Sequence, residues 1–246
     1  MNLVLLFEDD FVADDRVRLA GRRLQHVASV HRAAVGDELT VGVCGGRIGR
    51  GRVLRIDHDS LDLDVTLDRD PPPPARITLV LALPRPKVLN RVIASATSMG
   101  IKQIHLINAW RVEKSYWSSP RLTEENLRLQ SILGLEQARD TMLPSVTLHR
   151  LFRPFAEESL PAIARGTRAL AAHPPARAPL PRGVSEPVTL AIGPEGGFID
   201  AEIASLERAG FEAVTIGERI LRVETAVAWA VSWVLPLCQE RVTLLP

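Results

Sequence analysis

The 246-residue sequence contains only two cysteines, Cys44 and Cys238. They lie far apart in the chain and lack the close spacing that metal-binding cysteines have. The sequence therefore favours neither a disulfide framework nor a zinc site. Long hydrophobic runs are also missing. The longest, residues 226–237, is too short to span a bilayer, so we expect no membrane partner.

The chain has no strong net charge, and its first residues do not resemble a secretory leader. Its 30 basic and 29 acidic side chains give a formal net charge of +1. The first eight residues contain no basic residue and end on an acid, so we predict no signal peptide and a cytoplasmic location. Hydrophobic residues make up 46% of the chain, which is ample for a packed core and excludes a disordered or fibrous protein.

The charge is unevenly distributed. Residues 1–70 carry 10 basic and 13 acidic side chains, whereas residues 85–128 carry 8 basic and only 3 acidic ones. Such a basic segment is typical of a surface that binds nucleic acid. Clustered charge is more often only a solvated face. The composition leaves both interpretations open.

A run of prolines divides the chain into two parts. Residues 1–70 contain short alternating segments at 39–43, 47–56 and 60–67, which predict a small antiparallel barrel or sandwich. A short helix is expected within residues 16–33, with Leu24, Val27 and Val30 on one side. The four prolines at 71–74 predict a stiff, extended linker, which we place at residues 71–75.

Strands alternate with helices from residue 76 onward, which predicts an α/β domain with a largely parallel sheet covered on both faces. The expected strands are 76–83, 103–108, 146–148, 168–172, 187–192 and 213–216. The expected helices are 88–99, 123–139 and 155–165, with two more that begin at 200 and near 224.

The stretch Gly193-Pro194-Glu195-Gly196-Gly197 lies between a predicted strand and a predicted helix. Three glycines in five residues let the backbone approach a ligand closely, although an ordinary tight turn has the same composition. The spacing fits neither a dinucleotide fingerprint nor a P-loop. Because the Glu195 carboxylate would repel a phosphate, the loop favours a ligand that offers hydrogen bonds or positive charge.

A second loop of similar design follows at residues 216–226, with a turn at Gly217. Loops of this kind at the ends of parallel strands are where open α/β sheets bind their ligands. Together with the strand at 169–172, the two loops are expected to form the walls of one pocket.

These motifs resemble the signature of a known enzyme family. Gly193-Pro194-Glu195-Gly196-Gly197-Phe198 and Arg219-Ile220-Leu221-Arg222, followed by Glu224-Thr225-Ala226, are similar to the 16S rRNA uridine-N3-methyltransferases of the SPOUT superfamily. Residues 81–87, 111–117 and 136–139 look like further blocks of that family. Val223 stands where usual members have threonine, and the hydroxyl is lost.

The resemblance implies a SPOUT α/β-knot methyltransferase domain at residues 76–246, with a deep C-terminal trefoil knot. It also implies a PUA-like RNA-binding β-barrel at residues 1–70. The knot is expected from the resemblance only, since nothing in the residue pattern indicates one. SPOUT enzymes are usually homodimers. Trp229 and Trp233, on a helix that is apolar all round, are expected to lie between two subunits.

The implied reaction is transfer of a methyl group from S-adenosylmethionine to N3 of a uridine in 16S rRNA of the small ribosomal subunit. No metal is expected, because a sulfonium is already an excellent methyl donor. By resemblance, the cofactor-binding residues are Leu170, Ala172, Ile192, Gly193, Pro194, Glu195, Gly196, Gly197, Ile216, Gly217, Ile220, Leu221, Arg222, Glu224, Thr225 and Ala226.

Two residues are candidates for catalysis. The planar guanidinium of Arg222 suits a uridine carbonyl oxygen that gains negative charge. A salt bridge to Glu195 or Glu224 is the alternative role for Arg222. Both carboxylates are available as a base, but Glu224 could merely complement a helix N-terminus. We therefore prefer Glu195 as the base.

The candidates for RNA contact lie in the basic segment. Tyr116 and Trp117 are suited to stack on an unpaired base, although Trp117 could instead belong to the core. The candidates for phosphate contacts are Arg85, Lys87, Arg111, Lys114 and Arg121.

Two other functions compete with this one. The first is a ribosome-assembly factor without catalytic activity, although a pure RNA binder does not need a second, glycine-lined pocket. The second is a SPOUT enzyme that modifies tRNA, or a ribose hydroxyl instead of a base. The glycine-bearing loops are shared widely in that superfamily, whereas the block at residues 111–117 is not.

Overall fold

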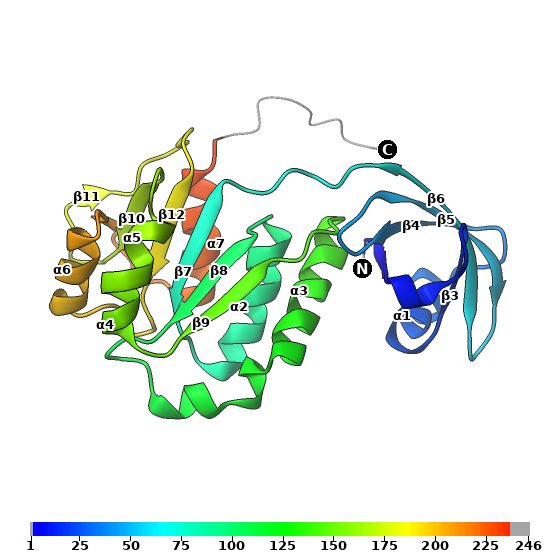
Figure 1. Ribbon diagram of the computed structural model, residues 1–246, viewed down its shortest axis with the longest axis horizontal. Helices are drawn as coiled ribbons and strands as arrows, with labels where there is room; N and C mark the ends of the chain where they lie inside the picture. Colours follow the sequence, from blue (N-terminus) through cyan, green and yellow to red (C-terminus); the bar gives the residue numbers. More distant parts are fainter. Residues whose placement is uncertain (1, 237–246) are drawn as a thin grey trace. The chain divides into compact units, whose positions relative to one another are not determined.

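Figure 1 shows the computed structural model, which describes residues 2–236. The described chain forms two compact units, each made of separate stretches of sequence. The first unit contains residues 2–74, 93–100 and 124–144, and the second contains residues 75–92, 101–123 and 145–236. Two stretches beyond the proline run thus belong with the N-terminal part of the chain.

Neither cysteine forms a disulfide that the structure describes. Cys44 is free and half-buried, and Cys238 lies outside the described residues. Within residues 2–236, no helix combines the length and the apolar character needed to cross a membrane.

The first unit is built on a six-stranded sheet with the strand order β1-β4-β5-β6-β3-β2. Inward and outward residues alternate along β6, where Leu61, Leu63 and Val65 are buried and the residues between them are not. This alternation is the reason that the sequence predicted β4, β5 and β6 correctly. The bounds are β1 Val4–Leu6, β2 Phe11–Ala13, β3 Arg16–Leu19, β4 Glu38–Val43, β5 Ile48–Ile56 and β6 Leu61–Arg69.

Strand β1 was not predicted, and it pairs in parallel with β4, whereas the other neighbours in this sheet are antiparallel. Its residues are apolar without alternation because both faces are buried. Val4 and Leu6 pack into one hydrophobic cluster, and Leu3 and Leu5 pack into another. Because the run is uniformly apolar, period-two alternation could not reveal it as a strand.

The helix predicted within residues 16–33 is shorter than expected. Its first part is strand β3, and the helical part consists of α1 (Gly21–His26) and the π-helical turn η2 (Val27–His31). Leu24 and Val27 are buried as predicted, but Val30 is 64% exposed. The wider π turn rotates Val30 away from the face that the other two share, because it has more residues per turn than an α-helix.

The second unit is built on a seven-stranded sheet with the strand order β11-β13-β10-β12-β7-β8-β9. All its pairings are parallel, which confirms the predicted α/β class. Only the two-residue strand β11 was not predicted. The bounds are β7 Ile77–Ala82, β8 Gln103–Ile107, β9 Ser145–His149, β10 Arg168–Ala172, β11 Ala178–Pro179, β12 Val188–Ile192 and β13 Glu212–Thr215.

Helices cover both faces of this sheet (Figure 1). Helix α6 packs against β13 and the π-helical turn η5 (Phe155–Ser159) on one face, and α7 packs against β12 on the other. The helix predicted at 155–165 is in fact one helical stretch of α4, η5 and α5. The helices of this unit are the first part of α2 (Pro86–Ser98), α4 Phe152–Pro154, α5 Leu160–Ile163, α6 Asp200–Arg208 and α7 Val223–Val234. The end of α2, from Ile93, and α3 (Glu124–Ala138) belong to the first unit.

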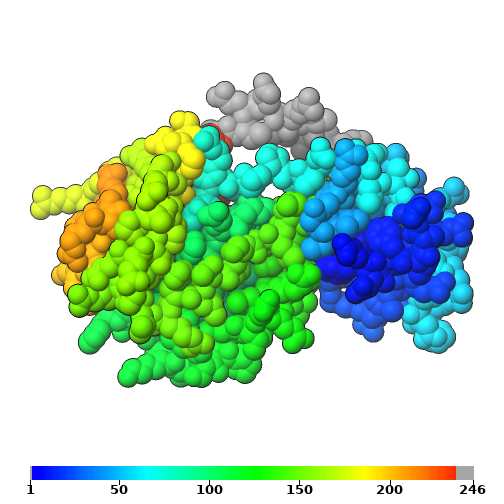
Figure 2. All heavy atoms as spheres, viewed as in Figure 1, coloured from blue at the N-terminus to red at the C-terminus, as the bar shows by residue number. Residues whose placement is uncertain are grey.

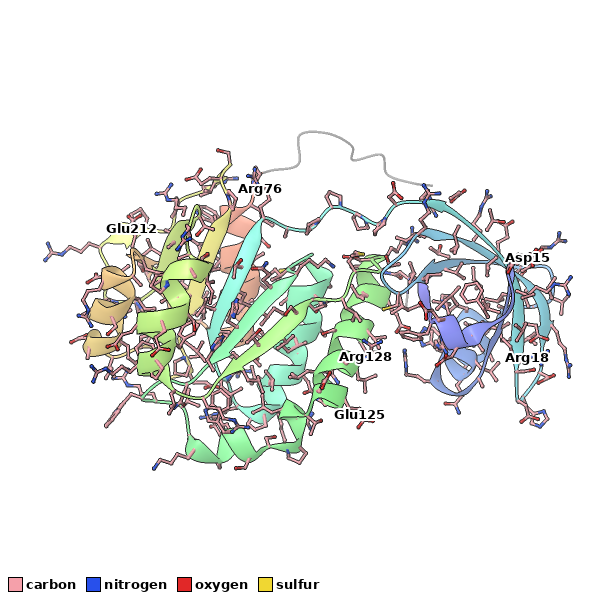
Figure 3. The ribbon with its side chains drawn as sticks, in the orientation of Figure 1. Asp15, Arg18, Arg76, Glu125, Arg128 and Glu212 are labelled. Carbon is pink, nitrogen blue, oxygen red and sulfur yellow. The ribbon has the colours of Figure 1, made fainter. Side chains whose placement is uncertain are left out.

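The central strands of this sheet end at the same level. Ala172 at the end of β10 lies beside Ile192 at the end of β12, and it also lies beside Val214 of β13. At the opposite end of the sheet, the guanidinium of Arg76 (labelled in Figure 3) donates to the carbonyl oxygen of Ser185 at 2.7 Å. Because the strands are parallel and in register, the three loops that follow them leave from one edge.

Two histidines lie together on strands β8 and β9. Nδ1 of His105 and Nε2 of His149 are 3.1 Å apart, and the His149 ring packs against Phe155. Burial, helped by the neighbouring His149, lowers the pKa of His105 to about 4. Burial also lowers the pKa of His149. The folded protein therefore keeps this pair neutral at a pH where free histidine begins to take up a proton.

We expect this pair to make stability depend on pH. In the unfolded chain His105 binds a proton near its ordinary pKa of 6.5, but in the folded protein only near 4. The free energy of unfolding should therefore fall as the pH drops through this interval and level off below it. Chemical denaturation across the interval should show a shallower fall for His105→Gln. The control is His58→Gln, at a site 89% exposed, which should keep the parental slope. Equal slopes for His105→Gln and the parent would contradict this account.

Candidate functional site

The loops that follow β10, β12 and β13 enclose a pocket with about 540 Å³ of empty space. Figure 2 shows the segment from β10 to α6 in yellow-green to orange at the surface of the second unit. We call this cavity the glycine pocket. It is lined by Ala172, His173, Pro174, Ile192, Gly193, Pro194, Glu195, Gly197, Ile216, Gly217, Arg219, Ile220, Leu221, Val223 and Ala226.

Glycine is needed in the loop after β12 for two different reasons. A Cβ on Gly193 would lie 2.8 Å from the backbone nitrogen of Phe198, which cannot move aside without distorting the loop. Gly197 has φ +73°, a left-handed conformation that favours glycine, and its N–H donates to the Pro194 carbonyl at 2.7 Å. The space around the missing Cβ of Gly197 is open, which leaves room for a ligand.

Glu195 lies on the pocket wall with its side chain 30% exposed. Its Oε1 accepts the backbone N–H of Arg85 at 3.0 Å and lies 4.0 Å from the Arg85 Nε. These contacts hold the carboxylate in one place at the pocket mouth. A carboxylate there attracts a positive group and repels an anion.

Arg222 is exposed and begins helix α7 as its N-cap residue. Both carboxylates proposed as alternative partners are engaged elsewhere. Glu195 interacts with Arg85, and Glu224 forms a 3.2 Å ion pair with Arg91. Within the part of the chain that the structure describes, the Arg222 guanidinium forms no ion pair, so it is available to a ligand.

A second and larger cavity adjoins the first, with about 1470 Å³ of open space. We call it the basic cleft, because Arg85, Lys87, Arg91 and Arg222 all line it. It shares Glu195, Ile220, Leu221 and Val223 with the glycine pocket. The remaining lining residues are Pro86, Val88, Tyr116 and Glu224. A long, negatively charged substrate can thus lie in the cleft and reach the pocket.

A third cavity, the side groove, has about 980 Å³ of open space on the outer side of the loop after β12. The Arg111 guanidinium donates a hydrogen bond to the Gly196 carbonyl there. A Cβ on Gly196 would lie 2.7 Å from Cδ of Arg111, so this glycine makes room for the arginine. The groove is lined by Arg111, His173, Pro174, Pro175, Glu195, Gly196, Gly197, Phe198, Ile199, Asp200 and Ile220.

The aromatic residues predicted to contact RNA occupy different environments. Tyr116 lines the basic cleft. Trp117 is half-buried, its indole N–H donates to Asn108 Oδ1 at 2.9 Å, and the guanidinium of Arg150 lies 5.2 Å from the ring centroid. The Trp117 ring is thus already stacked within the protein. This environment matches the alternative in which it has a structural role.

Most of the predicted site residues come together, but some do not. Leu170 is fully buried within the sheet and lines none of the three cavities. Thr225 is exposed in the first turn of α7. Lys114 is exposed and Arg121 half-buried on the turns after β8. Neither of these two lines a described cavity.

The pocket also contains two residues that the sequence did not single out, His173 and Pro174. These two residues directly follow β10, so their position at the carboxyl end of a central strand was the available signal. Arg219 and Val223 line it as well, within the loop at 216–226 that was predicted as a pocket wall. Val223 is buried against the pocket, where it presents methyl groups in place of the threonine of the resembled family.

With this geometry in place, comparison with known proteins identifies the family. A model of the RNA methyltransferase domain matches residues 71–235. The chain belongs to this RNA methyltransferase family. The resemblance inferred from the two loop motifs is thereby confirmed.

Named relatives match along most of their length. The chain is 29% identical over 242 residues to ribosomal RNA small subunit methyltransferase E of Treponema pallidum, covering 96% of this chain and 91% of that protein. It is 26% identical over 253 residues to the protein of the same name from Synechocystis, covering 96% and 78%.

Solved structures support the same fold. The small subunit methyltransferase E of Neisseria gonorrhoeae, solved bound to S-adenosyl methionine, matches with a TM-score of 0.71 at 22% identity. The match covers 94% of this chain and 95% of that one. A methyltransferase from Legionella pneumophila, solved with the same cofactor, has a TM-score of 0.70 at 22% identity.

Proposed function

We propose that this chain transfers the methyl group of S-adenosylmethionine to N3 of a uridine in 16S rRNA of the small ribosomal subunit. The observation that carries the proposal is the glycine pocket, which opens beside a basic cleft in a chain of the RNA methyltransferase family. The pocket suits the small cofactor, and the cleft suits a polyanion.

The pocket fits S-adenosylmethionine on two counts. Its walls are mostly apolar with exposed backbone groups, as in small-molecule sites, and its one carboxylate is Glu195. A negative charge at the mouth favours a ligand with a positive sulfonium and amino group and disfavours a nucleotide phosphate. We assign the adenosine to the loops at residues 192–197 and 216–221, whose backbone groups supply hydrogen bonds.

When bound, the cofactor supplies a methyl group on positively charged sulfur, an electrophile that needs no metal. The difficult partner is the uridine, because its N3 becomes nucleophilic only as its proton leaves. Arg222 stands where the basic cleft meets the pocket, and its guanidinium forms no internal ion pair within the described residues. We assign it to the uridine carbonyl oxygens, which gain negative charge as N3 loses its proton.

Glu195 is our candidate for the base that takes the N3 proton. It lines all three cavities, and the backbone N–H of Arg85 fixes its carboxylate. A fixed carboxylate at the junction of pocket and cleft can accept a proton from a bound base without reorganising. Arg85 acts here as a positioning residue through its backbone. Its side chain, with that of Lys87, remains available for phosphate contacts.

We assign the first unit to RNA binding, as the PUA-like barrel that the resemblance implies for residues 1–70. Its six-stranded sheet supports this assignment. An enzyme that modifies ribosomal RNA works where ribosomes are assembled, which supports a cytoplasmic location.

We also propose a homodimer that uses α7. Trp229 and Trp233 stack with ring centroids 5.0 Å apart and planes 12° apart, yet they stay 36% and 37% exposed. The guanidinium of Arg182 lies over the Trp233 ring, 4.9 Å from its centroid. A pair of exposed indoles on a helix that is otherwise apolar suits burial against a second subunit.

The trefoil knot belongs to the same proposal. The end of α7 is hydrogen bonded to the segment that precedes β12, because the N–H groups of Gly183 and Val184 donate to the carbonyls of Trp233 and Val234 at 3.1 and 2.7 Å. The C-terminal helix thus lies against an earlier loop, as it must when the chain is threaded through that loop.

The proposed activity can be tested directly. Small ribosomal subunits from a strain that lacks the gene would be incubated with the protein and S-adenosylmethionine carrying a labelled methyl group. We expect label on one uridine base of 16S rRNA, at N3. Label in tRNA, or on a ribose oxygen, would assign the enzyme to another SPOUT activity. No label in any RNA would support the assembly-factor alternative.

Two glycines with the same backbone angle test the cofactor pocket. Gly197 and Gly166 both have φ +73° and open space where a Cβ would lie, but only Gly197 lines the pocket. Alanine at either position should cost about 1 kcal/mol of stability, because the left-handed conformation is strained. Only Gly197→Ala should also weaken S-adenosylmethionine binding, by roughly tenfold or about 1.4 kcal/mol in calorimetry. Equal cofactor affinity for both variants would place the cofactor elsewhere.

Arg222 is predicted to act on the uridine and not on the cofactor. Loss of one donor from a preorganised site costs about a hundred- to a thousandfold in rate. Arg222→Ala should lose this much in single-turnover methylation while still binding cofactor, and Arg222→Lys should recover only part of it. Arg208→Ala, at the end of α6, removes an exposed guanidinium remote from the pocket and serves as the control. A rate within a few-fold of the parent, or loss of cofactor binding, would contradict the assigned role.

A further inference from the structure

Trp110 stands out among the described aromatic residues because it is 79% exposed. The other tryptophans are at least half covered, and each ring has a partner within the protein. An exposed indole presents apolar surface to water. Exposed apolar surface often marks a binding site, and tryptophan is enriched at such sites. Nothing in the described packing of the second unit requires a tryptophan at this position.

The backbone beneath this ring is held firmly. The N–H of Trp110 donates to Oε1 of Glu202 at 2.7 Å, and the other oxygen of the same carboxylate accepts the N–H of Ile199 at 3.0 Å. Glu202 is only 5% exposed, so these bonds are shielded from water. The carbonyl of Ala109 also accepts the N–H of Val112 at 3.0 Å, which closes a turn around Trp110. A ring on a fixed turn loses little conformational freedom on binding.

The turn is also placed next to the candidate site. Trp110 follows β8 closely, at the carboxyl edge of the sheet from which the pocket loops leave. Its neighbour Arg111 is hydrogen bonded to the Gly196 carbonyl and lines the side groove with Glu195. The ring therefore stands beside the loop that forms the wall of the glycine pocket.

The surroundings of the ring carry positive charge. Arg111 and Lys114 are exposed on the same stretch, and residues 101–114 carry three basic side chains against one acidic one, the exposed Glu113. Exposed cations beside an aromatic face are the combination by which proteins hold single-stranded nucleic acid, since the cations meet the phosphates and the ring stacks on a base. This charge favours RNA over an apolar protein partner as the occupant.

We propose that Trp110 is a base-stacking platform for an unpaired nucleotide of the RNA substrate, next to the nucleotide that enters the basic cleft. This role rests on the proposed function, because it takes the substrate to be RNA. It replaces the stacking role expected for Trp117, whose ring is already covered by Arg150. A stacked neighbour would hold the strand open and keep the target base at the mouth of the pocket.

The test measures binding of a short single-stranded oligouridine to the full-length protein, with an RNA duplex of equal length for comparison. Stacking is worth about 1–3 kcal/mol per base, so Trp110→Ala should raise the Kd for the single strand roughly tenfold and leave duplex binding unchanged. Trp110→Phe keeps an aromatic face and should stay within a few-fold of the parent. Trp110→Leu keeps apolar bulk without that face and should behave like alanine.

Each other outcome overturns the proposal. Parental affinity in Trp110→Ala, parental affinity in Trp110→Leu, or no measurable binding of the single strand by the parent would exclude stacking at this position. Parental RNA affinity combined with a changed oligomeric state would assign the ring to a contact between subunits. Thermal unfolding and S-adenosylmethionine binding should be unchanged in all variants, because the side chain is exposed.

The measurement is separate from the proposed activity. Oligouridine binding involves no methyl transfer, so it can fail while the parent still methylates small ribosomal subunits. Conversely, the parent protein could bind oligouridine through Trp110 but label no RNA. That result would support the base-stacking role and contradict the proposed reaction.

Discussion

The parallel pairing of β10, β12 and β13 in register is the constraint on which the site depends. Ala172 lies beside Ile192 and Val214, so the three strands end at one level and their loops start together. Parallel strands cannot be joined by tight hairpins, so each connection crosses the sheet and returns with a helix. The edge where the strands end is therefore free to form a pocket whose floor is the rigid sheet and whose walls are loops.

The ion pairs at the rim of the pocket determine which charged side chains remain free to contact a ligand. Glu195 is held by Arg85, and Glu224 is paired with Arg91. The carboxylates that could have neutralised Arg222 are thus engaged, and its guanidinium faces the basic cleft. The contacts of Glu195 with Arg85 and of Glu224 with Arg91 thus leave Arg222 without an internal ion pair within the described residues.

A buried carboxylate on α6 supports the other side of the site. Glu202 accepts N–H groups from both Ile199 and Trp110, and so it joins the turn after β8 to the start of α6. Arg111 adds a hydrogen bond to the Gly196 carbonyl from the same turn. The loop after β12 is therefore braced from outside by residues about 90 positions earlier in the chain. This brace fixes the positions of Trp110 and Arg111 at the pocket rim.

The sequence by itself determined the α/β class, most strand positions and the two glycine-bearing loops. These follow from local signals: apolar runs, alternation, and glycines at positions such as Gly193 and Gly197, where the backbone favours glycine. It failed at β1, because a strand buried on both faces does not alternate, and at Val30, because a π turn changes the helical period. The sequence could not predict which side chains contact one another. Only the tertiary structure decided that Trp117 is covered by Arg150, that Trp110 is exposed, and that Arg222 is left without an internal ion pair among the described residues. Such outcomes depend on contacts between residues distant in sequence, which no local pattern specifies.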